Sequence, residues 1–433
     1  MYERTPDISD VLERFDEGSE VVIRGWIHRV FKVGGKVFAW VRDHSGFIQV
    51  VFDKSGLSTE WESVERLSRE SSVEVRGSVR VDERAPGGKE VIATELVVYG
   101  YSPPFPIKGG EDVEYLLNVR HLWLRSRQMI ALLKIKHTVI QALKDWLLKD
   151  GWWETTPPIL TGSAVEGGAT LFEVKYFDKI AYLSQSAQLY LEVLIFPLNK
   201  VWALTPSFRA EKSRTRRHLS EYWHLEVEAA WYDMDDMMGV AEGLVSHAVA
   251  KTIEERKDEL KLLNRDISKL ESALHPPYPK VTYDEALEIL ARKGFNIGWG
   301  EDYGADEEKA LTEEFDKPFF VTHFPKRIKA FYMKEDPKRP EVVLGFDLLA
   351  PEGYGEVIGG SQREDDYEKL YNRVLMEGLD FKDYEWYLDL RKYGSVPHSG
   401  FGLGIERLVM WIAGIEHIRD AVPFPRWRER IYP

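Results

Sequence analysis

Residues 208–231 read FRAEKSRTRRHLSEYWHLEVEAAW. The apolar run before them, residues 201–204, predicts a buried strand. A loop with four arginines and His218 follows, and then a second strand-like run in which Glu226 and Glu228 share one face. The planar guanidinium of arginine binds phosphate through two parallel hydrogen bonds, and carboxylates bind an amino group. This hairpin therefore favours an anionic phosphate ligand that also carries an amino group. A solvated basic loop on an edge hairpin is the alternative interpretation.

Composition limits the class of protein. The chain has 433 residues, 44% of them apolar, with 14 tryptophans, which is enough for two or three domains and a large core. Its lack of cysteine excludes disulfides, thiolate metal sites and cysteine nucleophiles. The net charge of −14 argues against a generally basic nucleic-acid binder but allows a local basic groove. No signal peptide is evident and the longest apolar run, residues 408–415, is too short to span a bilayer, so we expect a cytoplasmic protein without a membrane anchor.

The first part of the chain is predicted to be all-β. Short runs rich in β-branched and aromatic residues are separated by glycine-containing turns, and a helix is expected at 57–71, between the third and fourth runs. The predicted strands are residues 21–27, 37–41, 48–52, 72–79 and 91–98. Five strands with a helix after the third are the plan of an OB-fold barrel, a common platform for single-stranded nucleic acid.

Two residues of the predicted barrel are suited to reading a base. Phe38 on one strand could stack on a base, and Gln49 on the next could bond its edge. Arg29 on the first strand is a weaker candidate for the same surface. The alternative is that Phe38 belongs to the core and Gln49 is an ordinary surface residue.

The order of residues after Phe208 resembles motif 2 of the class II aminoacyl-tRNA synthetases, in the subclass that charges aspartate, asparagine and lysine. A predicted helix with apolar residues at four-residue steps, followed by residues 151–160 (GWWETTPPIL), resembles motif 1. Residues 398–411 (HSGFGLGIERLVMW) resemble motif 3. In the anticodon-binding barrels of this subclass, an aromatic residue and a glutamine stand at the positions of Phe38 and Gln49.

This resemblance implies an α+β architecture. We expect an N-terminal OB-fold anticodon-binding domain at residues 1–102, a linker or hinge at 103–117, and a class II catalytic domain at 118–433. That catalytic domain would be built on an antiparallel sheet flanked by helices. A largely helical insertion is expected at about residues 234–340, and its sequence carries no motif to which we can assign chemistry. Motif 1 implies a homodimer.

The resemblance also implies the site residues. The expected ATP-binding set is Arg209, Glu211, Arg217, His218, Leu219, Tyr222, Glu356 and Arg407, with Arg209 and Arg407 as the catalytic pair. Glu166, in a glycine-rich loop suited to closing over a ligand, would hold the α-ammonium of the amino acid, and Gln188 would help to hold the substrate. Glu356 would bind Mg²⁺, with Asp347 as a possible second ligand.

Three positions bear on which amino acid is used. Aspartyl enzymes carry a lysine where this chain has Leu191, and an aspartate where it has Glu226. The chain resembles the asparaginyl members at both points. Glu226 would accept from the amide NH₂ of asparagine and repel the carboxylate of aspartate, while Arg363 would donate to the amide oxygen.

The implied reaction is the ATP-dependent attachment of asparagine to tRNA(Asn) through an asparaginyl-adenylate, with release of AMP and pyrophosphate. Three alternatives stay open at this point. They are an aspartyl-tRNA synthetase of relaxed tRNA specificity, a paralogue that makes free asparagine from aspartate, and a non-catalytic RNA-binding paralogue.

Overall fold

The structure is a computed structural model that describes residues 4–162, 171–211 and 215–433. The chain divides into two compact units, residues 1–116 and 117–433. Each unit has its own hydrophobic core.

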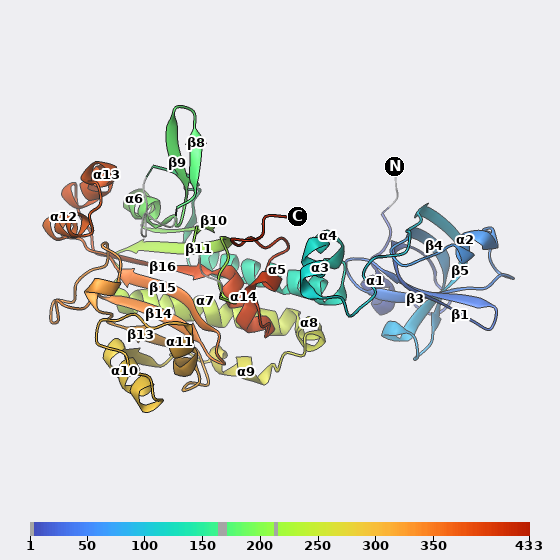
Figure 1. Cartoon of the computed structure of the whole chain (residues 1–433). Coiled ribbons are helices and arrows are strands. Elements are labelled where there is room, and N and C mark those ends of the chain that lie inside the picture. Colours follow the sequence, from blue (N-terminus) through green and yellow to red (C-terminus); the bar gives the residue numbers. More distant parts are fainter. Residues whose placement is uncertain (1–3, 163–170, 212–214) are drawn as a thin grey trace. The chain divides into compact units, whose positions relative to one another are not determined.

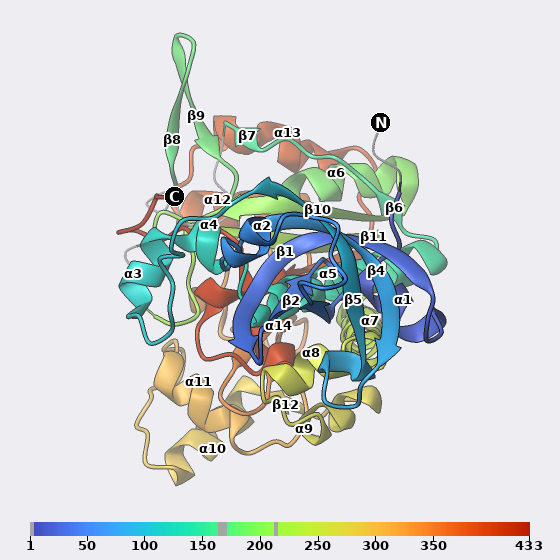
Figure 2. The same cartoon turned by 90° about the vertical axis from the view of Figure 1, so that its right-hand side faces the viewer.

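The first unit is a closed five-stranded barrel, and the predicted OB-fold is confirmed. The strands lie in the order β1 (Glu20–Val33), β2 (Lys36–Arg42), β3 (Phe47–Phe52), β5 (Lys89–Gly100) and β4 (Ser72–Val81), as Figure 2 shows in blue. The short helix α1 (Ile8–Arg14) precedes the barrel. Buried and less buried side chains alternate along these strands, and valine and isoleucine fill the interior.

The helix between the third and fourth strands is shorter than predicted. Helix α2 covers only Trp61–Glu65, not residues 57–71. The serine hydroxyls beyond it bond elsewhere, since Ser68 Oγ donates to the Ser102 carbonyl at 2.6 Å. Serine side chains that bond to backbone outside the helix compete with helix formation, which explains the early end.

The second unit is built on an eight-stranded sheet flanked by helices, as predicted (Figure 1). Its strand order is β12 (Lys280–Thr282), β13 (Phe319–Thr322), β14 (Gly345–Ala350), β15 (Gly355–Gln362), β16 (His398–Gly404), β11 (Glu221–Ala230), β10 (Lys200–Phe208) and β6 (Trp153–Glu154). The two outermost pairs, β12 with β13 and β6 with β10, are parallel, and the five central pairs are antiparallel.

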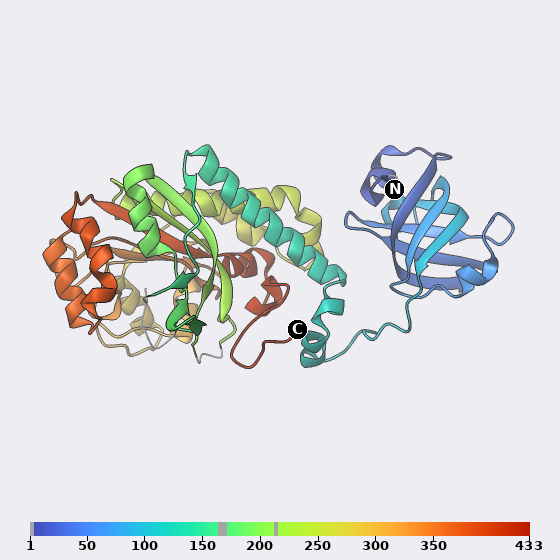
Figure 3. The same ribbon diagram turned by 90° about the horizontal axis from the view of Figure 1, so that it is seen from above.

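One face of this sheet packs on three helices. They are α5 (Arg127–Lys149), α7 (Met234–Glu255) and α14 (Ile405–Ala413), and α5 and α7 run side by side in Figure 3. Phe401 and Leu403 of β16 point into this core, where Ile135 and Leu143 of α5 are fully buried. Every second residue of β16 thus supplies the core, and the residues between them face the other side of the sheet.

The remaining elements surround this framework. They are α4 (Arg120–Trp123), β7 (Leu160–Thr161), β8 (Glu173–Tyr176), β9 (Lys179–Leu183), α6 (Gln188–Leu198), α8 (Lys257–Leu262), α9 (Ser268–Glu271), α10 (Tyr283–Arg292), α11 (Ala305–Thr312), α12 (Tyr367–Met376) and α13 (Phe381–Lys392). Helix α3 (Val113–Asn118) includes the boundary between the two units. Strands β8 and β9 form a projecting hairpin (Figures 1 and 2). Among the helices of the described residues, none combines the length and the apolar character needed to cross a membrane.

Residues 234–340, for which we predicted an insertion, are integrated into the second unit. Helix α7 lies in the main core, and β12 and β13 extend the central sheet at its edge. Helices α10 and α11 pack on that edge around a second cluster that includes Tyr283, Leu311 and Phe319. These elements therefore place side chains next to the strands that carry Asp347 and Glu356.

Candidate active site

The basic hairpin predicted from residues 208–231 is present. Strands β10 and β11 pair in antiparallel register, with Ala203 opposite Glu226 and Val201 opposite Glu228. Strand β11 is also paired with β16, which brings motif 2 beside motif 3. Residues 212–214 of the loop, which include Arg214, lie outside the described residues.

A glycine on β16 lets a carboxylate reach across the sheet. Gly400 lies between Glu228 on β11 and Ser361 on β15. A Cβ at Gly400 would stand 2.0 Å from Glu228 Oε2, so no other residue fits there without displacing that side chain. Glu228 can therefore accept two hydrogen bonds from Arg363, from Nε at 3.1 Å and from Nη2 at 2.9 Å. Arg363 also donates from Nη1 to Ser361 Oγ at 2.9 Å.

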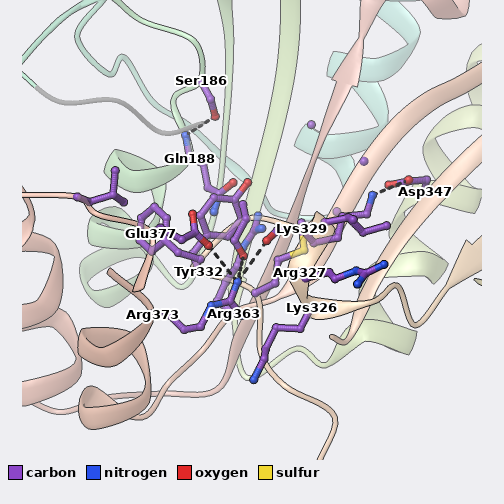
Figure 4. A pocket seen from close by; sticks show the side chains of 18 of the residues that line it. Ser186, Gln188, Lys326, Arg327, Lys329, Tyr332, Asp347, Arg363, Arg373 and Glu377 are labelled. Carbon is purple, nitrogen blue, oxygen red and sulfur yellow. Dashed lines mark hydrogen bonds and ion pairs between the residues drawn. The ribbon is translucent and has the colours of Figure 1, made fainter. Parts of the chain in front are cut away.

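The face of the sheet opposite the core carries a cavity of about 1050 Å³ (Figure 4). This is just above the range of ordinary ligand pockets, roughly 300–1,000 Å³. The predicted site residues that line it are Gln188, Arg209, Glu226, Asp347, Glu356 and Arg363. The structure thus brings together residues from α6, β11, β14 and β15 and from the segments that follow β10 and β15.

A smaller hollow of about 60 Å³ adjoins this cavity and shares Arg209, His224, Glu356 and Gly402 with it. Seven of the eight residues predicted to bind ATP line it: Arg209, Arg217, His218, Leu219, Tyr222, Glu356 and Arg407. The eighth, Glu211, lies beside it, with Oε1 3.8 Å from Arg209 Nη1. The guanidinium of Arg209 lies 5.7 Å from the centre of the Tyr222 ring.

Asp347 and Glu356 are two carboxylates on neighbouring strands whose pKa values move in opposite directions. Burial, together with the charge of Glu356, raises the pKa of Asp347 to about 7, although Lys329 acts to lower it. Burial acts to raise the pKa of Glu356, but Arg407 and Lys329 outweigh it and hold that pKa at about 2. Hard carboxylate oxygens next to arginines suited to phosphate are the donor set of a magnesium–nucleotide site. The residues present fit that ion.

Glu226 and Arg363, the predicted amide-reading residues, line the same cavity but are held by different partners. Glu226 accepts from the Ser186 hydroxyl and from the Ala187 amide at 2.7 Å, so it fixes the segment that leads into α6. Arg363 is held by Glu228. Glu226 Oε2 also lies 3.6 Å from His224 Nδ1.

On the barrel, the three predicted nucleic-acid residues lie on one outer face. Phe38 stacks on Phe31 with ring centres 5.3 Å apart and planes 4° apart. Gln49 accepts from Trp40 Nε1 at 3.2 Å and donates to Glu90 at 2.7 Å. Arg29 lies 5.7 Å from the Trp40 ring. Phe38 is half-buried and not part of the barrel interior, which argues against the core interpretation.

Comparison with known proteins agrees with both halves of this picture. Residues 112–428 match the family described as tRNA synthetases class II (D, K and N). Residues 21–99 match the OB-fold nucleic acid binding domain. The asparagine–tRNA ligase of Pyrococcus furiosus is 60% identical over 421 residues, which cover 96% of this chain and 97% of that relative.

The chain belongs to the asparagine–tRNA ligase family. The crystal structure of asparaginyl-tRNA synthetase from Pyrococcus horikoshii complexed with asparaginyl-adenylate superposes with a TM-score of 0.97 at 57% identity, covering 99% of this chain and 100% of that one. The Entamoeba histolytica asparaginyl-tRNA synthetase in complex with asparaginyl-adenylate gives 0.90 at 34% identity, covering 97% and 98%. As a member of this family the chain is an aminoacyl-tRNA synthetase, a ligase.

In this ligase, Leu191 has a clear structural place. It lies in the first turn of α6 and is fully buried in an apolar cluster with Ile195, Val201 and Ala203. No cation stands at that position to neutralise a substrate carboxylate. Glu166, predicted to hold the α-ammonium, lies outside the described residues.

Sequence reasoning missed a buried charge network behind the ligase pocket. Glu192 on α6 accepts from Arg391 Nη2 at 2.7 Å, from the Tyr387 hydroxyl at 2.8 Å and from Gln188 Nε2 at 3.0 Å. Its Oε2 also lies 2.9 Å from His398 Nε2. Burial acts to raise the pKa of Glu192, but Arg391 and His398 lower it. A charged residue inside the apolar run of 188–198 was the available signal.

Sequence reasoning also missed a basic wall of the cavity formed by Lys326, Arg327, Lys329 and Arg373. Figure 4 shows Lys329 directed at Asp347, and its Nζ lies 2.8 Å from Asp347 Oδ2. These residues come from a loop after β13 and from α12, neither of which carries a recognised motif.

The close approach at Gly400 predicts the effect of one added methyl group. Gly400→Ala should lower the free energy of unfolding by about 1–3 kcal/mol, because the new Cβ forces Glu228 from its place, and should raise KM for asparagine. Urea unfolding and pyrophosphate exchange measure the two effects. Gly239→Ala in α7, where a Cβ meets nothing within 4 Å, is the control and should not be destabilising. A Gly400→Ala protein as stable as the parent would contradict the packing argument.

Proposed function

We propose that the chain attaches asparagine to tRNA(Asn) in two steps, through an asparaginyl-adenylate formed from ATP. The observation that carries this proposal is that Arg209 belongs to both hollows. An arginine between a phosphate-binding cleft and an amino-acid cavity lies where the bond between the two substrates must form.

The first step would be in-line attack of the asparagine carboxylate on the α-phosphorus of ATP, with pyrophosphate leaving. No side-chain nucleophile is needed, because orientation and charge neutralisation lower the barrier. Arg209 would hold the α-phosphate and the attacking carboxylate together. Tyr222 and Arg407 would enclose the adenine. The other phosphates would bond to Arg217, His218 and Arg407.

Asp347 and Glu356 would hold Mg²⁺, which would neutralise charge on the phosphates when bound. Lys329 and Arg407 now bond to these carboxylates. They keep the carboxylates compensated in the structure described here. Glu211, beside Arg209, would contact ATP or the tRNA end.

Recognition of asparagine would depend on two oppositely charged residues. Glu226 would accept from the amide NH₂, and Arg363, held firmly by Glu228, would donate to the amide oxygen. A substrate aspartate would instead bring its carboxylate against Glu226, with no cation at Leu191 to compensate. Polar matching of this kind can discriminate by as much as ~10⁴–10⁵. Gln188 would help to hold the substrate, and Glu166 its α-ammonium.

The activation step is tested by pyrophosphate exchange into ATP. Exchange should depend on asparagine and not on aspartate, and Arg209→Ala should lower it by about 10²–10³-fold, as loss of a group that neutralises transition-state charge does. Arg84→Ala, an exposed arginine on the barrel, is the matched control and should leave exchange unchanged. Near-normal exchange in Arg209→Ala, or exchange with aspartate alone, would reject the assignment.

The outer face of the barrel would bind the anticodon of tRNA(Asn). Phe38 would stack on a base and Gln49 would form hydrogen bonds to a base edge. Arg29 would contribute to the same binding surface. Phe38→Ala should raise KM for tRNA by about tenfold or more, since stacking on an aromatic ring contributes roughly 1–3 kcal/mol per base.

Pyrophosphate exchange should stay normal in Phe38→Ala, because that reaction needs no tRNA. Tyr99→Ala, which removes an exposed aromatic at the far end of β5, is the control and should leave the KM for tRNA unchanged. Equal KM values for tRNA in Phe38→Ala and the parent would exclude this face.

Motif 1 would form a homodimer. Leu148, Trp153, Ile159 and Leu160 leave large apolar surfaces exposed along residues 148–160, and β6 is the edge strand of the sheet. A cluster of exposed apolar side chains at an edge strand is typical of a surface that a second chain covers. The cytoplasmic location predicted from the sequence accompanies this function as part of the proposal.

Dimer formation is measured by sedimentation equilibrium. Trp153→Glu should raise the dissociation constant of the dimer at least about tenfold, because a charge in place of a central aromatic removes packing and adds a desolvation cost. Trp299→Glu, on an exposed loop of the second unit, is the control and should leave the dissociation constant unchanged. A monomeric parent protein would reject the dimer.

A further inference from the structure

Helix α11 carries a carboxylate, Glu308, that contacts an arginine of the smaller hollow. Glu308 lies in the first turn of α11 (Ala305–Thr312) and is buried. It forms a two-pronged ion pair with Arg217, in which Nη1 donates to Oε1 at 2.9 Å and Nη2 donates to Oε2. The Glu356 amide also donates to Glu308 Oε1. One carboxylate thus holds an arginine from motif 2 and the backbone of the strand that carries Glu356.

The surrounding backbone is shaped for this arrangement. Gly355 has φ of +74°, and a Cβ there would lie 1.7 Å from Arg217 Nη1 and 2.2 Å from Glu308 Oε1. Arg217 Nη1 also donates to the Tyr354 carbonyl at 2.7 Å. At the end of α11, Thr312 Oγ1 accepts from the Gly353 amide at 3.0 Å. Helix α11 is therefore fixed to the start of β15 through Glu308 and to the turn before β15 through Thr312.

Arg217 and Glu356 both line the hollow to which we assign ATP, and Glu308 does not. We propose that Glu308 is a positioning residue for nucleotide binding. It holds the guanidinium of Arg217 and the carboxylate of Glu356 in their binding positions before ATP binds. This inference deepens the proposed function and rests on it. It also assigns a role to residues 234–340, which carry no recognised motif.

The hydrogen bonds that Arg217 already forms within the protein support a positioning role for Glu308. Glu308 and the Tyr354 carbonyl use both protons of Nη1 and one of Nη2. An arginine has five donors, so Nε and the second Nη2 proton are left for a phosphate. Fixing a long, flexible side chain beforehand removes the entropy cost of ordering it on binding. The effect should therefore appear in the affinity for ATP and magnesium and leave the amino-acid cavity unaffected.

The test is pyrophosphate exchange in Glu308→Gln, titrated separately with ATP, Mg²⁺ and asparagine. We expect KM for ATP to rise about 10-fold to 100-fold, as the loss of a charge-assisted bond does, with KM for asparagine within about twofold of the parent. The Mg²⁺ concentration for half-maximal rate should rise with it. Glu313→Gln, an exposed glutamate at the end of the same helix, should match the parent.

A double-mutant cycle with Arg217→Gln separates positioning from a general loss of structure. Since Glu308 would act on ATP through Arg217 and on Mg²⁺ through Glu356, adding Glu308→Gln to Arg217→Gln should change KM for ATP, measured at saturating Mg²⁺, by less than about twofold. Glu308→Asp, which keeps the charge on a shorter arm, should recover part of the affinity. Unchanged KM for ATP in Glu308→Gln, additive effects in the cycle, or equal rises in both KM values with a lowered Tm would overturn the inference. A parent protein without asparagine-dependent exchange would instead reject the proposed function itself.

Discussion

The active site depends on a stretch of nearly bare backbone in the middle of the sheet. In β16, Phe401 and Leu403 point into the core, and the alternate positions on the other face are Gly400, Gly402 and Gly404. From residue 400 to residue 404, that face therefore has no side chains of its own. Groups from β11 and β15 can meet over it, as Glu228 and Arg363 do. The alternation of residues along β16 places large apolar side chains in the core and glycines on the side of the cavity. One strand therefore contributes both to the packing of the core and to the space in which substrates bind.

The buried carboxylate of Glu406, in motif 3, contacts residues of motif 1 and motif 2. Glu406, at the start of α14, accepts from Lys136 of α5 at 2.6 Å and from the Trp223 amide of β11 at 3.0 Å. Residues distant in sequence are thereby fixed to one group, which holds the hairpin that carries Arg209 and Tyr222 against the helical layer. Since both charges are buried, loss of either partner would leave the other uncompensated, a cost of about 3–5 kcal/mol.

Much of the architecture follows from local sequence patterns. The barrel strands are short β-branched runs, and α5, which ends shortly before Gly151, has its apolar residues at four-residue steps. The spacing of apolar residues and the glycines that end each element therefore predict them. The helix at 61–65 was predicted too long because the serines after it bond to distant backbone. The residues expected around ATP were found because they lie in recognised motifs, and they meet in one hollow because β11, β16 and β15 are neighbours in the sheet. Glu192 and Glu308 escaped notice because their partners Arg391 and Arg217 are 199 and 91 positions away, a distance at which no sequence pattern operates.

The buried network behind the cavity has a consequence for how such a pocket can change over evolutionary time. Glu192 and Glu228 are each matched by an arginine, Arg391 and Arg363, and all four side chains are almost fully buried. Any single replacement that alters charge leaves one buried ion without its counterpart. Routes from this pocket to one of different charge therefore pass through intermediates of low stability unless two positions change together. The preference of the enzyme for its amino acid is in this sense protected by the folding of the protein as well as by selection on its activity.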